Sequence, residues 1–433
     1  MKVRLPFVIA TLLVFGVVGF AFSTSPTTWF EEGLMQGSPP AEEKLVNKSN
    51  WLEPPFNRWA FQNISMIHKV APVSRGIGPV AIFPRNTLDL DGVVYKDHNG
   101  EEHSFREMLD MTYTDAIVIL HEGKIVYEKY FNGMTPQSRH ILFSTTKSLA
   151  GTMAAVLVHN GLLDPTQRTT TYIPELEGSA FGDATVRQVL DMTTGIEYSE
   201  EYSDMNSEVV SHMIAADYRP FPEGYIGPMT LQTFLPRLKK KGEHGAAFHY
   251  VSANTEVLGW LMERATDVSS AELFSDMIWS KLGAERDGMI IVDRSGFPSW
   301  GGGFACTTRD FARFGLMIMN NGIANGQQVV PTEVVEGFRN GADKKAFSLS
   351  AEGKKGEPME GWSYHDQWWV THNKNGAFTA IGIYGQWCYI DPAAQMVIVK
   401  FSSFTAARGR PLDYDTIYAF EAMGEHFKQS EEQ

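Results

Sequence analysis

Strand-like patterns occur on both sides of a long helical stretch, and this arrangement limits the folds open to the chain. Apolar and polar residues alternate in TDAIVILHEGKIVYEKYF (residues 114–131) around a Glu122-Gly123 turn, which predicts a β-hairpin. Strand patterns return in residues 377–403, whereas helical periodicity dominates from Ser144 to about residue 285. We therefore expect an α/β (α+β) fold, with an antiparallel sheet built from both ends of the chain and flanked by helices, and an inserted all-α domain.

Smaller features extend this pattern into a domain plan. Residues 24–110 are rich in Pro, Gly and polar residues, which predicts an extended N-terminal lead-in that wraps the core, and they include an aromatic patch, WLEPPFNRWAF (51–61). Residues 413–427 are typical of a closing amphipathic helix, and Gly195 can end a helix that starts near residue 184. The expected domains after residue 110 are a sheet domain, 111–145 with 286–433, and a helical domain, 146–285.

The N-terminus carries an export pattern. Lys2 and Arg4 precede an apolar stretch that ends in small residues near Ala21 and Ser23. We expect residues 1–23 to be a signal peptide or, alternatively, an uncleaved anchor that attaches the protein to a membrane. In both cases the folded part is expected in the periplasm or another extracytoplasmic space.

Composition excludes several classes of protein. The chain has 433 residues, 43% of them hydrophobic, and a formal net charge of -14, which is typical of an ordinary globular protein. The compact basic run RLKKK (237–241) stands alone, so we expect no nucleic-acid partner. Cys306 and Cys388 are too few for a disulfide framework; buried free thiols are expected, with a single bridge as the alternative. The sequence does not indicate an oligomeric state.

One Ser-x-x-Lys sequence, Ser144 to Lys147, stands at the start of an apolar helical segment. Residues three apart lie on the same helix face, and burial lowers the pKa of a lysine amine toward the neutral form that can take a serine's proton. The N-terminus of the helix also offers free N–H groups to a developing oxyanion. In the alternative, purely structural interpretation, Ser144 caps a core helix and Lys147 reaches solvent.

A second segment, GAAFHYVSANTEVLGWLMERATD (245–267), contains Tyr250, Ser252 and Asn254. With STTKSLAGT, GGGFACTTRDFARFG, QWWVTHN and GIYGQ, in this order along the chain, it makes the sequence resemble the serine β-lactamase-related hydrolases. This superfamily comprises class C β-lactamases, penicillin-binding D-amino-acid peptidases, serine esterases and 6-aminohexanoate-oligomer (nylon oligomer) hydrolases, and the last branch is the most similar. The resemblance covers most of the chain after about residue 51 and implies a β-lactamase/transpeptidase-like fold.

The resemblance also implies roles for three side chains. Ser144 corresponds to the acyl-accepting nucleophile, Lys147 to the amine that takes its proton, and Tyr250 to the phenol that relays the proton to the leaving group. Ser252 to Asn254 also fits the Ser-x-Asn form of other members, so two registers compete. We favour Tyr250, because its separation in sequence from LGW (258–260) matches the Tyr form of the family.

A strand that lines the site in relatives corresponds here to AIGIYGQ (380–386). The resemblance places Gly382 at its glycine and gives the oxyanion donors as the backbone N–H groups of Ser144 and Ile383. It also assigns substrate contacts to Tyr202 and Trp369. The strand lacks the cation that relatives use to hold a substrate carboxylate, which disfavours turnover of penicillins and cephalosporins.

Two further comparisons bear on function. Met213 falls where efficient oligomer hydrolases carry a carboxylate for the substrate's ammonium end, which disfavours 6-aminohexanoate oligomers as substrates. The chain has no Gly-x-Ser-x-Gly, His-Glu-x-x-His, paired Cys-x-x-Cys or phosphate loop, so we expect no metal and no cofactor.

We therefore expect an exported serine hydrolase that cleaves a small-molecule amide or ester through a Ser144 acyl-enzyme. It would be 6-aminohexanoate-oligomer-hydrolase-like or carboxylesterase-like. The alternatives are a D-amino-acid peptidase or β-lactamase, and a non-catalytic sensor of β-lactams or cell-wall peptides on the same fold.

Overall fold

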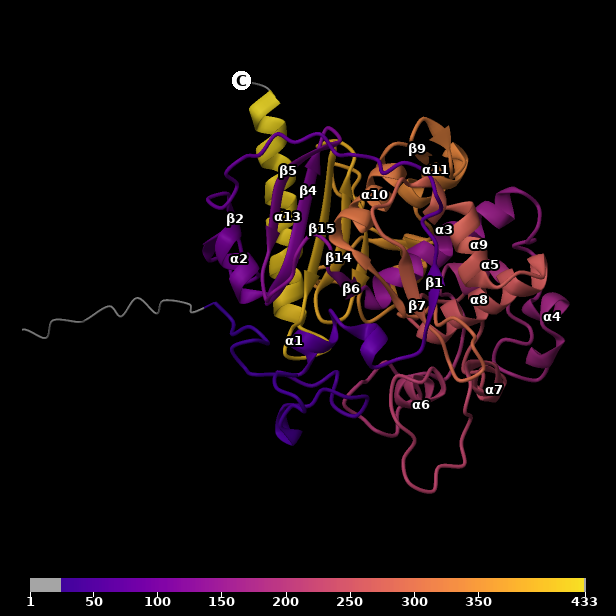
Figure 1. The fold of residues 1–433 in the computed structure, drawn as a ribbon. Coiled ribbons are helices and arrows are strands. Elements are labelled where there is room, and N and C mark those ends of the chain that lie inside the picture. Colours follow the sequence, from indigo (N-terminus) through magenta and orange to yellow (C-terminus); the bar gives the residue numbers. More distant parts are fainter. Residues whose placement is uncertain (1–24, 432–433) are drawn as a thin grey trace, which may run out of the picture.

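The computed structural model describes residues 25–431, so the expected signal peptide or anchor, residues 1–23, lies outside the described residues. Within 25–431, no helix has both the length and the apolar character needed to cross a membrane. Figure 1 shows a central sheet beside a mainly helical part.

The central sheet has seven antiparallel strands, and both ends of the chain contribute to it. The register aligns Ile398 of β15 with Ile119 of β4, so a strand from near residue 400 pairs with one from near residue 118. The strands β4 and β5 form the hairpin predicted around Glu122 and Gly123. In spatial order the sheet consists of β11 (Ser363–His365), β12 (Trp368–Val370), β13 (Phe378–Gly382), β14 (Gln386–Asp391), β15 (Met396–Ser402), β4 (Thr114–His121) and β5 (Lys124–Tyr130).

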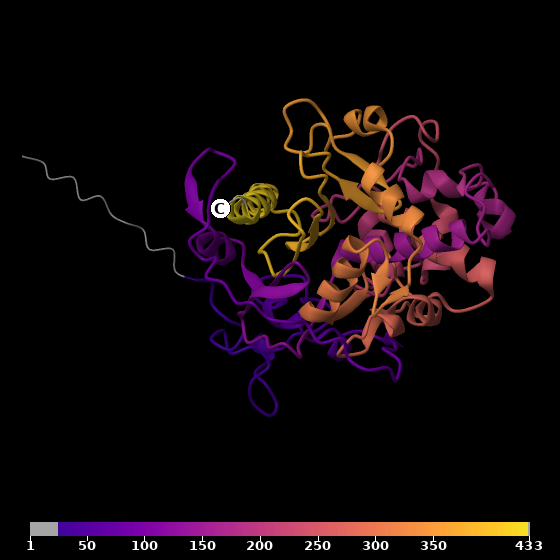
Figure 2. The same ribbon diagram turned by 90° about the horizontal axis from the view of Figure 1, so that it is seen from above.

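Helices cover both faces of this sheet because successive residues of β4 point to opposite sides. Ile117 and Ile119 belong to the apolar cluster that contains α2 and α13, whereas Val118 and Leu120 belong to the cluster that contains α10. The views in Figures 1 and 2 place α13 along one face of the sheet. The bounds of these helices are Phe105–Met111 (α2), Thr308–Met319 (α10) and Arg410–Glu431 (α13). The predicted closing helix is therefore confirmed.

A smaller antiparallel sheet, in the order β1-β7-β8-β6, lies next to the helical part. One of its strands, β1, comes from the expected lead-in. Its strands are β1 (Val70–Val73), β6 (Arg139–Ile141), β7 (Gly288–Ile291) and β8 (Phe304–Thr307). The short strands β2 (Val94–Lys96), β3 (Glu102–Ser104), β9 (Ile323–Ala324) and β10 (Gln327–Gln328) form two separate hairpins. The domain boundaries given above stay a prediction.

The helical part is built around α3 and α8, which pack against each other. Every residue of α3 from Thr146 to Leu157 is buried, so the helix is enclosed on all sides. The helix α3 spans Thr146–His159, and α8 spans Ser252–Thr266. The remaining α-helices of the described chain, within and outside the helical part, are α1 (Asn57–Ala60), α4 (Thr169–Tyr172), α5 (Val186–Leu190), α6 (Glu208–Ala215), α7 (Leu231–Phe234), α9 (Ser270–Met277), α11 (Thr332–Asn340) and α12 (Lys344–Ser348).

The prediction that Gly195 ends a helix is wrong. The helix α5 already ends at Leu190, and Asp191 caps it. Gly195 instead lies where two loops approach closely, because a Cβ atom on it would be 2.5 Å from the carbonyl oxygen of Gly242. The glycine therefore serves loop packing and not helix termination.

Candidate active site

Ser144 lies in a tight turn between the two sheets and the helical part. The helix predicted from Ser144 begins as a 3-10 turn, η3 (Phe143–Thr145), and α3 follows from Thr146. Phe143 has φ of 43°, in the left-handed region that a phenylalanine rarely adopts. Such strain needs support from packing. The centroid of the Phe143 ring lies 4.8 Å from that of Phe61 and 5.9 Å from that of Trp51. Both partners belong to the aromatic patch of the lead-in.

Lys147 is adjacent to the Ser144 hydroxyl. Its Nζ atom lies 2.9 Å from Ser144 Oγ and also donates a hydrogen bond to the carbonyl oxygen of Gly301. Burial lowers the pKa of Lys147 to about 8, while the carboxylates of Glu200 and Glu256 oppose this shift. Near pH 8, Lys147 is therefore neutral in a large fraction of the protein molecules, as a general base requires.

Tyr250 completes the group around the serine. It lines the first pocket together with Ser144, and its ring centroid lies 5.2 Å from Lys147 Nζ. Burial, with a contribution from Glu200, raises the pKa of Tyr250, so the phenol keeps its proton. Trp369 of β12 stacks on Tyr250 with the ring centroids 5.4 Å apart.

In the competing Ser-x-Asn register, Asn254 would take the place of Tyr250 beside Ser144, but it lies elsewhere. Asn254 Oδ1 accepts a hydrogen bond from Thr194 Oγ1 at 2.8 Å, and Asn254 does not line the pockets that contain Ser144. Ser252 begins α8, and its backbone N–H donates to Glu200. The structure thus brings Ser144, Lys147 and Tyr250 together and leaves Asn254 outside the group.

Two buried carboxylates behind the site were not identified from the sequence. Glu200 accepts hydrogen bonds from the Ser252 N–H at 2.7 Å and from the Tyr202 hydroxyl at 2.6 Å. Glu256 accepts from the Gly301 N–H at 3.0 Å and so holds the loop whose carbonyl contacts Lys147. The sequence could have indicated Glu256, because it is a lone acid directly before the apolar stretch VLGWL. Glu200 lies in a polar loop among other acids, so no sequence feature distinguishes it.

The end of β13 approaches the nucleophile turn because residue 382 is glycine. A Cβ atom on Gly382 would lie 2.7 Å from the carbonyl oxygen of Leu142 and 3.2 Å from the backbone nitrogen of Ser144. Any larger residue would push the strand away. Ile383, the next residue, lines the pockets next to Ser144.

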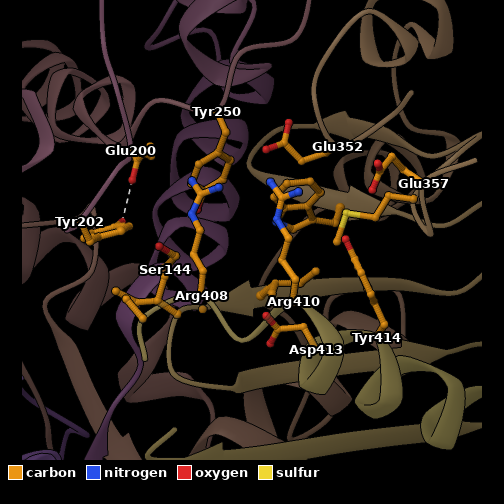
Figure 3. A pocket seen from close by; sticks show the side chains of 16 residues that line it. Ser144, Glu200, Tyr202, Tyr250, Glu352, Glu357, Arg408, Arg410, Asp413 and Tyr414 are labelled. Atoms are coloured by element: carbon orange, nitrogen blue, oxygen red, sulfur yellow. Dashed lines mark hydrogen bonds between the residues drawn. The ribbon is translucent and has the colours of Figure 1, made fainter. Parts of the chain in front are cut away.

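Two pockets meet at Ser144. The first, of about 820 Å³ including its open mouth, contains Tyr250, Tyr202 and Trp369 (Figure 3). The second, of about 420 Å³, contains Tyr202, Ile383 and Met213. Tyr202 and Ile383 border both pockets, so a substrate bound at Ser144 can place one half in each.

Two groups of side chains within residues 25–431 could hold a metal ion, and both lie away from this site. The side chains of Asp191, His365 and Asp366 converge, but Arg187 already pairs with both aspartates. This cluster joins α5 to the turn between β11 and β12, and the ion pairs among its own side chains account for its arrangement without a metal. The other convergent group, Asp97, His98 and Asp415, lies at the contact of α13 with the β2–β3 loop. Neither group lines a pocket with Ser144.

Cys306 and Cys388 are free and buried, which agrees with the expectation of buried free thiols and not with the alternative of a single bridge. Burial raises the pKa of both thiols, so they stay protonated at neutral pH.

Comparison with known proteins agrees with this geometry. The profile of the Beta-lactamase family matches residues 105–420. The chain is 39% identical over 355 residues to a 6-aminohexanoate-dimer hydrolase of Paenarthrobacter ureafaciens, covering 82% of this chain and 87% of that protein.

Solved structures give the same result. A Bacillus anthracis protein, provisionally named a 6-aminohexanoate-dimer hydrolase, superimposes with a TM-score of 0.82 and 31% identity over 90% of this chain and 99% of that one. A family VIII carboxylesterase shares the fold, with a TM-score of 0.55 and 18% identity over 74% of this chain and 96% of that one. The chain therefore belongs to the Beta-lactamase family, and it is a serine hydrolase of amide or ester bonds.

Proposed function

We propose that Ser144 is the nucleophile of this hydrolase and forms an acyl-enzyme with its substrate. The supporting observation is the 2.9 Å separation of Ser144 Oγ and the buried Nζ of Lys147. Neutral Lys147 takes the serine proton while Oγ attacks the carbonyl carbon. Tyr250 passes a proton to the leaving nitrogen or oxygen, and water then releases the acid and regenerates Ser144.

The backbone N–H groups of Ser144 and Ile383 are proposed as the oxyanion hole. The close approach of Gly382 to the Ser144 nitrogen supports this assignment, because it places the following N–H beside the same turn. Removing one oxyanion donor typically costs about 10²–10³ in turnover. Tyr202 and Trp369, which line the pocket together with Tyr250, are proposed to contact the substrate.

The substrate class follows the relatives. The Paenarthrobacter ureafaciens protein is named for a 6-aminohexanoate dimer, and a carboxylesterase shares the fold. We propose a small amide or ester for this chain, with Met213 weakening recognition of an ammonium-ended oligomer. The export pattern of residues 1–23 supports an extracytoplasmic location, with or without membrane attachment.

Intact-mass spectrometry tests the nucleophile. Wild-type protein and Ser144→Ala are exposed to a fluorophosphonate and to short 4-nitrophenyl esters, and nitrophenol release is followed. We expect the wild type alone to gain one adduct and to release nitrophenol over many turnovers. Equal behaviour of both proteins would exclude Ser144, and labelling without repeated turnover would favour a sensor.

A further inference from the structure

Arg408 places a cation at the mouth of the first pocket. It lies on the loop between β15 and α13, is exposed to solvent and lines the pocket with Ser144 and Tyr250. Figure 3 shows its side chain pointing from the loop into the pocket. Among residues 25–431, no carboxylate lies within ion-pair distance of its guanidinium, unlike the buried Arg58 and Arg313, which both form ion pairs. Its charge is therefore available to a ligand.

The field of Arg408 acts on the reacting groups. Burial and Glu200 raise the pKa of Tyr250 and of Tyr202, and the charge of Arg408 acts against this increase. Because Arg408 lines the same pocket as Tyr250, its guanidinium lies beside the space where the leaving group of a substrate would lie.

Two of the acids that line this pocket, Glu200 and Asp413, have partners of their own. Glu200 accepts the two hydrogen bonds from Ser252 and Tyr202 described above. Asp413 is buried beside Lys400, and burial raises its pKa to about 7, so it carries a full charge only at higher pH. Neither acid neutralises Arg408 by direct contact.

The position of Tyr250 decides which half of the substrate meets Arg408. A phenol that protonates the leaving atom must lie on the leaving-group side of the scissile bond. Tyr250 lines the first pocket and not the second. The leaving half therefore occupies the pocket that contains Arg408.

The second pocket then receives the acyl half, and its walls suit an uncharged group. Its apolar lining includes Phe143, Val209, Met213 and Ala216. The ionisable residues here, His212 and Glu256, bond to each other, and Glu256 also accepts three further hydrogen bonds. An ammonium group in this pocket would find no free carboxylate, whereas a short aliphatic chain would lose only water.

We propose that Arg408 binds a carboxylate on the leaving half of the substrate, so that the enzyme prefers a short, uncharged acyl group joined to an amine or alcohol that carries a carboxylate. This inference rests on the proposed function. In the reaction the acyl carbon–nitrogen or carbon–oxygen bond breaks, Ser144 Oγ forms the new ester, and the leaving atom receives its proton through Tyr250. Water then hydrolyses the ester, giving an uncharged-chain carboxylic acid and an amino or hydroxy acid.

Matched chromogenic substrates test the preference. The probes are 4-nitrophenyl butanoate and its 3-carboxy-4-nitrophenyl counterpart, with the corresponding butanoyl anilides as the amide pair. We expect the wild type to favour the carboxylated member. Arg408→Gln should reduce kcat/KM for that member by about ten-fold or more, mainly through KM, because a charge-assisted hydrogen bond is lost, and should change kcat/KM for the neutral member much less.

Three comparison variants sharpen the result. Arg408→Lys should retain part of the preference, and Arg264→Gln, which removes an exposed arginine from α8 far from the pocket, should retain all of it. Loss of the preference in Arg410→Gln but not in Arg408→Gln would overturn the assignment. An equal rate for both substrates in the wild type would overturn the inference while leaving the proposed function intact. Failure of both substrates together with failure of Ser144 labelling would refute both proposals.

Discussion

Lys147 experiences opposing influences that set the working pH of the site. Burial favours the neutral amine, whereas Glu200 and Glu256 favour the ammonium form, and the resulting pKa is about 8. Full desolvation without these acids would lower the pKa of the lysine further. The two buried carboxylates therefore keep Lys147 partly protonated near neutrality, so the group can both take and return a proton.

This balance predicts the pH dependence of activity. Only neutral Lys147 can accept the serine proton, and the neutral fraction grows as pH rises, so kcat/KM should increase up to about pH 8 and then level off. Steady-state rates with 4-nitrophenyl butanoate between pH 5.5 and 9.5 measure the profile, after subtraction of spontaneous hydrolysis. Here the sign is fixed: a profile that falls between pH 6 and 8 would contradict Lys147 as the base.

Glu200→Gln is the matched variant for this prediction. The amide keeps an oxygen for the Ser252 N–H but removes the charge that raises the Lys147 pKa. The midpoint of the profile should therefore move to lower pH. An unchanged midpoint would show that another group controls the rise.

At the scale of elements, the lead-in supports the catalytic turn. Trp51 stacks against Phe143 with centroids 5.9 Å apart, and its indole N–H donates to the carbonyl oxygen of Tyr218 at 2.8 Å. Tyr218 in turn lines the second pocket. The aromatic patch thus holds the left-handed Phe143 and one wall of the acyl pocket in place, although it lies about ninety residues before the serine in the chain.

Trp51→Phe should therefore slow acylation of Ser144, because a smaller ring supports the strained turn less well and the hydrogen bond to Tyr218 is lost. The matched control is Trp279→Phe, since Trp279 is also fully buried and donates its indole N–H to a carbonyl, at 3.3 Å from Arg286 O. Both variants should lose about 1–3 kcal/mol of unfolding free energy. Only Trp51→Phe should reduce the rate of fluorophosphonate labelling, by about ten-fold if the turn shifts.

Urea unfolding and labelling kinetics, each measured on both variants, separate the two effects. Equal labelling rates in the two variants would show that Trp51 serves stability alone.

Elements whose signals are local could be predicted from the sequence. The hairpin of β4 and β5 followed from its alternation and its Glu-Gly turn, and the closing helix α13 from its amphipathic pattern. The end of α5 could not be predicted, because Asp191 is held there by His365 and by the Asp366 N–H, which lie far later in the chain. A glycine that fits a helix end by pattern can serve a loop contact instead, as Gly195 does.

At the scale of the whole molecule, the site combines segments from nearly the full length of the chain. Ser144 and Lys147 could be found because their spacing places them on one helix face, and Tyr250 because the segment around it resembles a motif of the family. Arg408 and Glu200 could not, because each is one charged residue in a polar loop, and only the fold brings them to the pocket. The sheet that joins both ends of the chain places the β15–α13 loop beside a turn that lies more than 250 residues earlier.

This assembly predicts a distributed response to a covalent adduct. A phosphonate on Ser144 fills the junction of the two pockets and contacts segments from both structural parts, so it should reduce their local opening. Hydrogen–deuterium exchange should slow in 200–202, 299–302, 381–383 and 407–410, all of which contribute residues to these pockets. Exchange in β5, which forms one edge of the main sheet, should stay unchanged. Ser144→Ala treated with the same reagent provides the reference, and protection limited to the η3 turn would mean that the adduct bridges nothing beyond its own helix.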